Sequence, residues 1–152
     1  MPKLKILGTA GYHQSETRHT VCAFLPEYGI VFDAGSGIFR LRGQIQTPSI
    51  DVFLSHMHLD HSAGITYLLD VLWGTKTKVR IWGIKEHLDA LRTQLFGGLL
   101  FPLDFGGDKC PYETREIVPG NWVGLYRTDI DKNFSFCAQT LPHPGKSIGY
   151  RF

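Results

Sequence analysis

The stretch Ser55-His56-Met57-His58-Leu59-Asp60-His61 places three imidazoles and one carboxylate within six consecutive positions. Residues 50–54 before it form an apolar run typical of a strand, and residues 62–73 after it are long enough for a helix. The stretch is therefore predicted to lie on a loop between a strand and a helix. On such a loop, side chains can converge on one point.

The spacing of these four side chains favours metal binding over a polar loop with chance histidines, because three of the chain's seven histidines fall here. His56 and His58 are two residues apart, so in extended backbone they point the same way. Asp60 and His61 lie at the predicted helix start, where the helix dipole favours a carboxylate and disfavours imidazolium. Ionised carboxylate and neutral imidazole are the forms that bind metal. Zinc suits this donor set first, with manganese and iron as the alternatives.

Length and composition narrow the class of protein. A chain of 152 residues corresponds to one domain, and a net charge of +2 is too small to indicate nucleic-acid binding. The sequence contains no apolar run near the ~20 residues that span a membrane, and its N-terminal apolar run is too short for a signal peptide. Three widely spaced cysteines without a C-x-x-C pair indicate buried thiols in a reducing compartment, so we expect a cytoplasmic protein.

The order of predicted elements indicates a layered α/β architecture with a mixed sheet that opens on a β-meander. Strands are predicted over residues 3–7, 20–25, 30–32, 50–54, 78–82, 116–118, 122–127, 134–141 and 147–152. Helices are predicted over residues 62–73 and 85–96, with a short helix ending near residue 41 and a loop over residues 99–111. His87 is expected on the helix surface, and Trp73, Trp82 and Trp122 in the core.

The H-x-H-x-D-H pattern resembles the signature of the metallo-β-lactamase-like superfamily of metal-dependent hydrolases. The pattern that begins at His143 and ends in Gly149-Tyr150-Arg151 is similar to the third metal-ligand block of ribonuclease Z and related small phosphodiesterases. The resemblance covers nearly the whole chain and implies the αββα sandwich of that superfamily. It implies only the N-terminal part of the sandwich: the first sheet with its helices and the start of the second sheet. Residues 1–152 are thus expected to be one metallo-β-lactamase-like domain that is incomplete at its C-terminal end.

The resemblance also assigns roles to the site residues. It implies that His56, His58 and His143 hold a first metal ion, and that Asp60 and His61 hold a second, with Asp60 also handling a proton. A complete site of the family holds two zinc ions. A later bridging aspartate and a distal histidine have no counterpart here, since only nine residues follow His143, so one zinc ion is expected.

Asp33 ends a predicted strand and precedes Ala-Gly-Ser-Gly. It is either a turn former, since Asp and Gly both favour turns, or, as the resemblance implies, a partner that orients the metal-binding loop.

The implied activity is hydrolysis of a small phosphodiester or nucleotide-like substrate by a metal-bound hydroxide. Two alternatives stay open: thioesterase or lactamase chemistry on the same fold, and an inactive metal-binding fragment. The sequence names no substrate-binding residue, and without an exosite segment it does not support a tRNA partner. A second copy of the chain could complete the fold.

Overall fold

The first sheet begins as an antiparallel meander and continues in parallel, as predicted. The computed structural model describes residues 2–152, and its first sheet has the strand order β1-β2-β3-β4-β5-β6. The strands are β1 (Lys5–Gly8), β2 (Cys22–Leu25), β3 (Ile30–Phe32), β4 (Ser49–Phe53), β5 (Lys78–Gly83) and β6 (Glu113–Glu116). Pairing is antiparallel from β1 to β3 and parallel from β3 to β6. Every residue of β4 is buried, as expected for a central strand that is covered on both faces.

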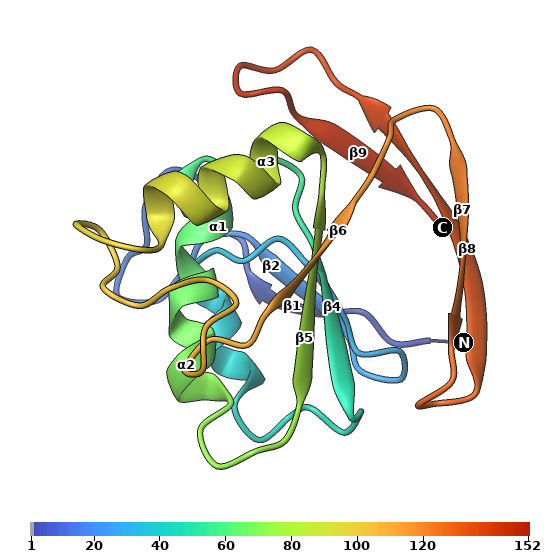
Figure 1. The fold of residues 1–152 in the computed structure, drawn as a ribbon, viewed down its shortest axis with the longest axis horizontal. Helices are drawn as coiled ribbons and strands as arrows, with labels where there is room; N and C mark the ends of the chain where they lie inside the picture. Colours follow the sequence, from blue (N-terminus) through green and yellow to red (C-terminus); the bar gives the residue numbers. More distant parts are fainter. Residues whose placement is uncertain (1) are drawn as a thin grey trace.

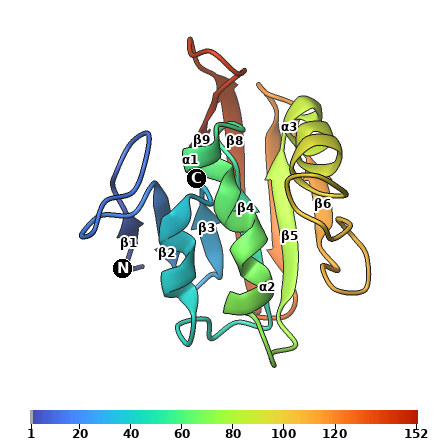
Figure 2. The same ribbon diagram turned by 90° about the vertical axis from the view of Figure 1, so that its left-hand side faces the viewer.

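A second, antiparallel sheet of three strands packs on the first. It has the order β7-β8-β9 and comprises β7 (Trp122–Arg127), β8 (Lys132–Thr140) and β9 (Ile148–Arg151). Figures 1 and 2 show helices on one face of the first sheet and the second sheet on the other face. This arrangement confirms the predicted architecture, in which a first sheet with its helices is followed by the start of a second sheet.

The helix predicted over residues 62–73 starts earlier and is irregular. It consists of α1 (Leu59–Ser62), the 3₁₀ segment η2 (Ala63–Tyr67) and α2 (Leu68–Val71). Gly64 explains the irregularity, because its amide donates to Ala34 O at 2.7 Å and a Cβ there would lie 2.3 Å from Gly35 O. This close packing against the chain after β3 competes with regular helix geometry. A second 3₁₀ segment, η1 (Ser36–Leu41), occupies the place of the predicted short helix.

The second predicted helix is α3 (Lys85–Ala90), continued by the π-helical segment η3 (Leu91–Leu95). Leu88, Leu91 and Leu95 are buried as its amphipathic pattern predicts. The prediction for His87 is wrong, because this residue is only 2% exposed. Residues 99–111 form a loop, as predicted, because no helix or strand lies between Leu95 and the start of β6 at Glu113.

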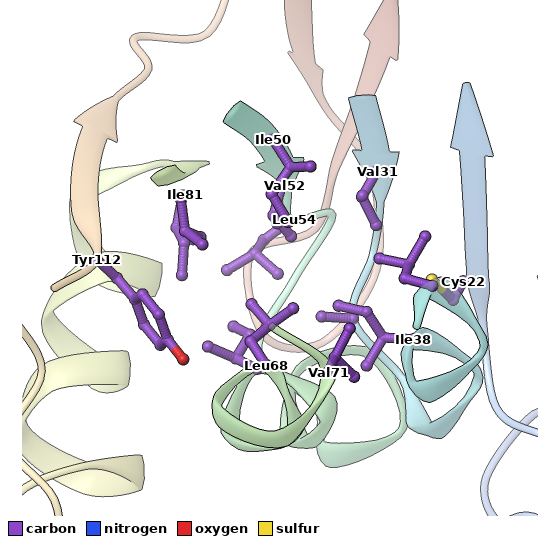
Figure 3. Close-up of a cluster of buried hydrophobic side chains, with 14 of the residues drawn as sticks. Cys22, Val31, Ile38, Ile50, Val52, Leu54, Leu68, Val71, Ile81 and Tyr112 are labelled. Carbon is purple, nitrogen blue, oxygen red and sulfur yellow. The ribbon is translucent and has the colours of Figure 1, made fainter. Parts of the chain in front are cut away.

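Two hydrophobic clusters hold the three layers together. The first lies between the helices and the first sheet, where Leu68 and Val71 of α2 face Ile50, Val52 and Leu54 (Figure 3). The second lies between the sheets and contains aromatic side chains. There the rings of Phe53 and Trp82 stack at 5.5 Å, and Phe136 from β8 meets Phe53 edge-on.

A buried ionic network also joins the two sheets. Asp51 of β4 is fully buried, and its carboxylate accepts hydrogen bonds from Arg80, Trp82 and, across the sheets, Arg127 of β7. Arg127 is 1% exposed and also pairs with Asp129 at 2.7 Å. Removing one partner from such a network leaves a buried charge unpaired and is strongly destabilising.

Other details differ from the sequence-based expectations. Trp82 is buried as predicted, but Trp73 and Trp122 are 74% and 58% exposed, so the prediction that they lie in the core is wrong. β6 lies at residues 113–116 rather than 116–118; its mostly exposed sequence Glu-Thr-Arg-Glu carries no apolar signal.

All three cysteines are free and buried, as predicted. Across residues 2–152, the structure has no helix with the length and apolar character needed to cross a membrane.

Candidate metal centre

Three separate segments meet at one end of the sandwich. Asp33 follows β3, the Ser55–His61 stretch follows β4, and His143 lies in the loop between β8 and β9. Because β3 and β4 are parallel neighbours, their carboxyl ends open at the same edge of the sheet. The β8–β9 loop reaches this edge from the second sheet (Figure 1), where Ile148 N donates to Ser55 O at 2.8 Å and Tyr150 Oη donates to Leu54 O at 2.7 Å.

Three histidines from two of these segments form one compact group. His56, His58 and His143 each offer a ring nitrogen, and these nitrogens all lie within 4.8 Å of one another. The ring centroids of His56 and His143 are 4.7 Å apart, and those of His58 and His143 are 5.2 Å apart. His56 is buried, whereas His58 and His143 are exposed, so the group is reachable from solvent.

Neighbouring oxygen atoms determine which ring nitrogen stays free. His143 Nδ1 lies 2.5 Å from Pro144 O, and because a carbonyl only accepts, Nδ1 carries the hydrogen. His56 Nδ1 lies 3.0 Å from Ser55 Oγ, whose own hydrogen is donated to Asp33 Oδ2 at 2.8 Å, so Nδ1 again donates. When either ring is in its neutral form, the Nε2 lone pair is therefore left for a ligand.

Asp33 connects the segments as an acceptor. Its Oδ1 accepts from Ser55 N at 2.7 Å, and its Oδ2 accepts from Ser55 Oγ and from His61 Nδ1, both at 2.8 Å. Asp33 also has a positive φ of 55°, a conformation that Asp tolerates better than most residues. The residue is thus both a strand-ending turn and a hydrogen-bonded support of the histidine-bearing loop.

Asp60 and His61 form a second, smaller group at the start of α1. His61 Nε2 lies 3.3 Å from Asp60 Oδ2, and the His61 and His56 ring centroids are 4.1 Å apart. All the site residues predicted from the sequence are thus found at one place.

The pKa values of two of these rings are shifted in opposite directions: that of His56 is lowered and that of His61 is raised. Burial, followed by the like charges of His61 and His58, lowers the pKa of His56 from 6.5 to about 4. Burial also acts to lower the pKa of His61, but the hydrogen bond to Asp33 and the charges of Asp33 and Asp60 raise it overall. At neutral pH His56 is a neutral imidazole, the form that binds a metal ion.

From the sequence, no role at this centre was assigned to Ser55 or His87. Ser55 bridges Asp33 and His56, and its place next to the motif was the available signal. His87 binds the backbone of the β8–β9 loop, with Nε2 3.0 Å from Lys146 O. The four-residue spacing of His87, Leu91 and Leu95 could have indicated that it is buried.

Comparison with known sequences yields two ribonucleases Z. The protein from Gemmatimonas aurantiaca is 31% identical over 132 residues, which cover 81% of this chain and 40% of that protein. The protein from Pyrococcus abyssi is 23% identical over an alignment of 159 positions, which covers 100% of this chain and 48% of that protein. The chain therefore spans less than half the length of either relative. No protein-family model matches it.

Solved structures share the fold over most of this chain. The metallo-β-lactamase fold protein YhfI from Bacillus subtilis superposes with a TM-score of 0.66 at 17% identity, covering 97% of this chain and 56% of that chain. The short form of human tRNase Z (ELAC1) gives a TM-score of 0.67 at 23% identity, covering 97% of this chain and 62% of that chain. Yeast PDE1 gives a TM-score of 0.56 at 14% identity, covering 91% of this chain and 61% of that chain.

Fold and site together define a metallo-β-lactamase-fold protein, with the histidine cluster at the loop edge of its first sheet. The chain has the metallo-β-lactamase fold and is similar in sequence to two ribonucleases Z, as its motifs predict.

Proposed function

We propose that this chain is a metal-dependent hydrolase of phosphodiester bonds. In this proposal His56, His58 and His143 hold a first zinc ion, and Asp60 and His61 hold a second one more weakly. The observation that carries the proposal is the group of three imidazole nitrogens within 4.8 Å of one another.

The donor set fits zinc on three grounds. Three imidazole nitrogens leave one position of a tetrahedral zinc ion open, as in catalytic zinc sites. His56 has a pKa of about 4 and needs no deprotonation at neutral pH. The Nδ1 hydrogens of His56 and His143 are held by oxygen acceptors, an arrangement that orients zinc-binding histidines and raises their basicity.

When bound, the ion supplies Lewis-acid chemistry, since it lowers the pKa of water and neutralises charge on phosphoryl oxygens. The chain's own residues have separate tasks. Asp33 keeps the His61 ring oriented through the Nδ1 hydrogen bond. The Asp60 carboxylate, 16% exposed, lies beside His61 and is our candidate for accepting a proton at an Oδ atom.

The names of the matched proteins favour phosphodiester bonds as the substrate class. Two relatives are ribonucleases Z, one structural neighbour is a tRNase Z and another is PDE1. We therefore propose a small phosphodiester or nucleotide-like substrate. Thioester and lactam hydrolysis on the same fold are the competing chemistries.

A non-catalytic metal-binding chain is the alternative of a different class. One observation favours it: within residues 2–152, a single group of three or more metal-binding side chains is found, while Asp60 and His61 form only a pair. A second copy of the chain is a further source of ligands that we propose for the weaker position.

The test compares three substrates with the zinc-loaded protein: bis(p-nitrophenyl) phosphate, a thioester and a chromogenic cephalosporin. We expect turnover of the phosphodiester alone, and loss of that turnover in His143→Ala. Preferential turnover of the thioester or the cephalosporin would overturn the substrate class. Zinc binding without turnover of any substrate would support the non-catalytic alternative.

A further inference from the structure

His87 is a buried polar residue. It lies on α3 and is 2% exposed, next to Gly83 at the end of β5. The contact is close, because a Cβ on Gly83 would lie 3.2 Å from His87 Cβ. No residue of the proposed metal centre lies on α3, so the metal centre alone does not account for His87.

Only one of the two ring nitrogens of His87 has a partner. Nε2 lies 3.0 Å from Lys146 O, and because a carbonyl only accepts, Nε2 carries the hydrogen. Burial lowers the pKa of His87, so the ring is neutral and Nδ1 is a bare acceptor. Among the buried side-chain nitrogen and oxygen atoms of residues 2–152, Nδ1 of His87 is the one without a hydrogen-bond partner. A buried unpaired acceptor is unfavourable for folding, so an apolar side chain would serve the core better. What His87 adds is its bond to Lys146.

The loop that receives this bond has an uncommon backbone. Gly145 and Lys146 have positive φ angles of 88° and 57°, and the Lys146 conformation is sparsely populated for a residue with a side chain. The loop passes directly over the metal centre, where a Cβ on Gly145 would lie 3.2 Å from His58 Nε2. Such a backbone persists only where surrounding contacts hold it.

We propose that His87 is a positioning residue for the metal centre: its Nε2 hydrogen bond to Lys146 O fixes the β8–β9 loop so that His143 stays beside His56 and His58. The inference rests on the proposed function, because it gives His143 a metal to bind. The proposal gives a role to a residue of α3, a helix that carries none of the predicted ligands. Through the bond to Lys146, α3 is connected to the β8–β9 loop of the second sheet.

A second link between α3 and the loop is an ion pair of Lys146 with Glu86. Its side chains are 64% and 54% exposed, and exposed pairs of this kind contribute little and are screened by salt. Glu86→Gln is therefore a matched control: it breaks a contact from the neighbouring residue to the same lysine without touching the buried hydrogen bond.

The experiment compares His87→Gln with His87→Met. Both side chains have similar length, but only Gln has an N–H that can reach Lys146 O. Zinc affinity is measured by competition with a chelator. Exchange of the amide hydrogens of residues 141–148 is measured in zinc-free protein, and Tm is measured for each variant.

We expect His87→Met to lower zinc affinity about 10- to 100-fold and to speed amide exchange in the loop, while its Tm stays equal or rises. His87→Gln should keep most of the affinity and protection, and Glu86→Gln should match the unmodified protein. Equal behaviour of the Gln and Met variants, or loss of folding in both, would overturn the proposal and assign His87 to the core.

The two readouts separate this inference from the proposed function. If the unmodified protein binds no zinc but His87→Met still speeds amide exchange in the loop, then His87 does fix the β8–β9 loop and the metal assignment fails. If zinc binds and neither variant alters zinc affinity or amide exchange, then the metal assignment stands and the positioning role of His87 is overturned.

Discussion

Asp33 Oδ2 accepts a hydrogen bond from His61 Nδ1 at 2.8 Å, which joins the end of β3 to the first turn of α1. The carboxylate also holds Ser55 through both its amide and its hydroxyl. One side chain thus organises both ends of the histidine-bearing stretch.

Asp33→Asn tests this support. Asn tolerates the positive φ of 55° at this position, so the fold should be retained. The lost charge, however, is the one that holds Ser55, whose hydroxyl accepts from His56, and that orients His61. We expect zinc affinity to fall ~10–100-fold, measured by chelator competition. Asp70→Asn, which alters an exposed pair with Arg42, serves as the control. Unchanged affinity in Asp33→Asn would reduce Asp33 to a turn residue.

Gly145→Ala tests how closely the β8–β9 loop must approach His58. A Cβ there would lie 3.2 Å from His58 Nε2, so the loop or the ring has to shift. Gly120→Ala is the matched control, since Gly120 has φ +91° and a Cβ there would meet no atom of residues 2–152 within 4 Å. Both variants should lose about 1 kcal/mol of stability from backbone strain. Only Gly145→Ala should also weaken zinc binding. Equal zinc affinity of the two variants would show that the close approach is unimportant.

Removal of a predicted ligand should lower metal content directly. We expect His58→Ala to abolish stoichiometric zinc binding, measured by elemental analysis after gel filtration, because two imidazoles remain in the group. His13→Ala removes an exposed histidine that contributes no atom to the group and should leave zinc content unchanged. Full zinc content in His58→Ala would contradict its role as a ligand.

The ionic network between the sheets gives a pH-dependent stability. The hydrogen bond from Arg127, together with Ser49, holds the pKa of Asp129 well below its usual 3.8. A carboxyl whose pKa is lowered by folding stabilises the protein above its unfolded pKa, and that stability is lost as pH falls through the folded pKa.

Asp129→Asn should therefore be less stable than the unmodified protein by a constant margin above about pH 5, and the margin should shrink as pH falls below about 4. Urea unfolding of zinc-free protein between pH 3 and 7 measures it. A margin that is independent of pH would show that Asp129 stabilises by packing rather than by charge.

The sequence predicted the elements whose signal is local. Residues 30–32 and 122–127 are strands as predicted, because β-branched and aromatic residues between turn signals mark them. The metal-binding stretch was also predictable, because a chelating set within six positions is a local feature. The sequence allowed two interpretations of Asp33, a turn former or a support of the metal-binding loop. In the structure Asp33 is both.

Features set by long-range contacts were missed. The break in the helix after Ser62 depends on Gly64 meeting the backbone of Ala34, a contact 30 positions away. The hydrogen-bond partner of His87 could not be predicted, because its bond to Lys146 spans 59 positions. Trp73 and Trp122 were assigned to the core on residue type alone, but an apolar ring can remain on the surface.

Anomalous diffraction at the zinc absorption edge, on crystals grown with zinc, tests the central claim most directly. We predict one strong peak per chain of residues 1–152, about 2.0–2.1 Å from a nitrogen of His56, His58 and His143, with a weak peak or none at Asp60 and His61. A fully occupied peak only at other residues, or no peak among the three histidines in zinc-soaked crystals, would contradict the account. Two fully occupied peaks within about 4 Å of each other, without ligands from a second copy, would contradict the prediction that Asp60 and His61 bind weakly.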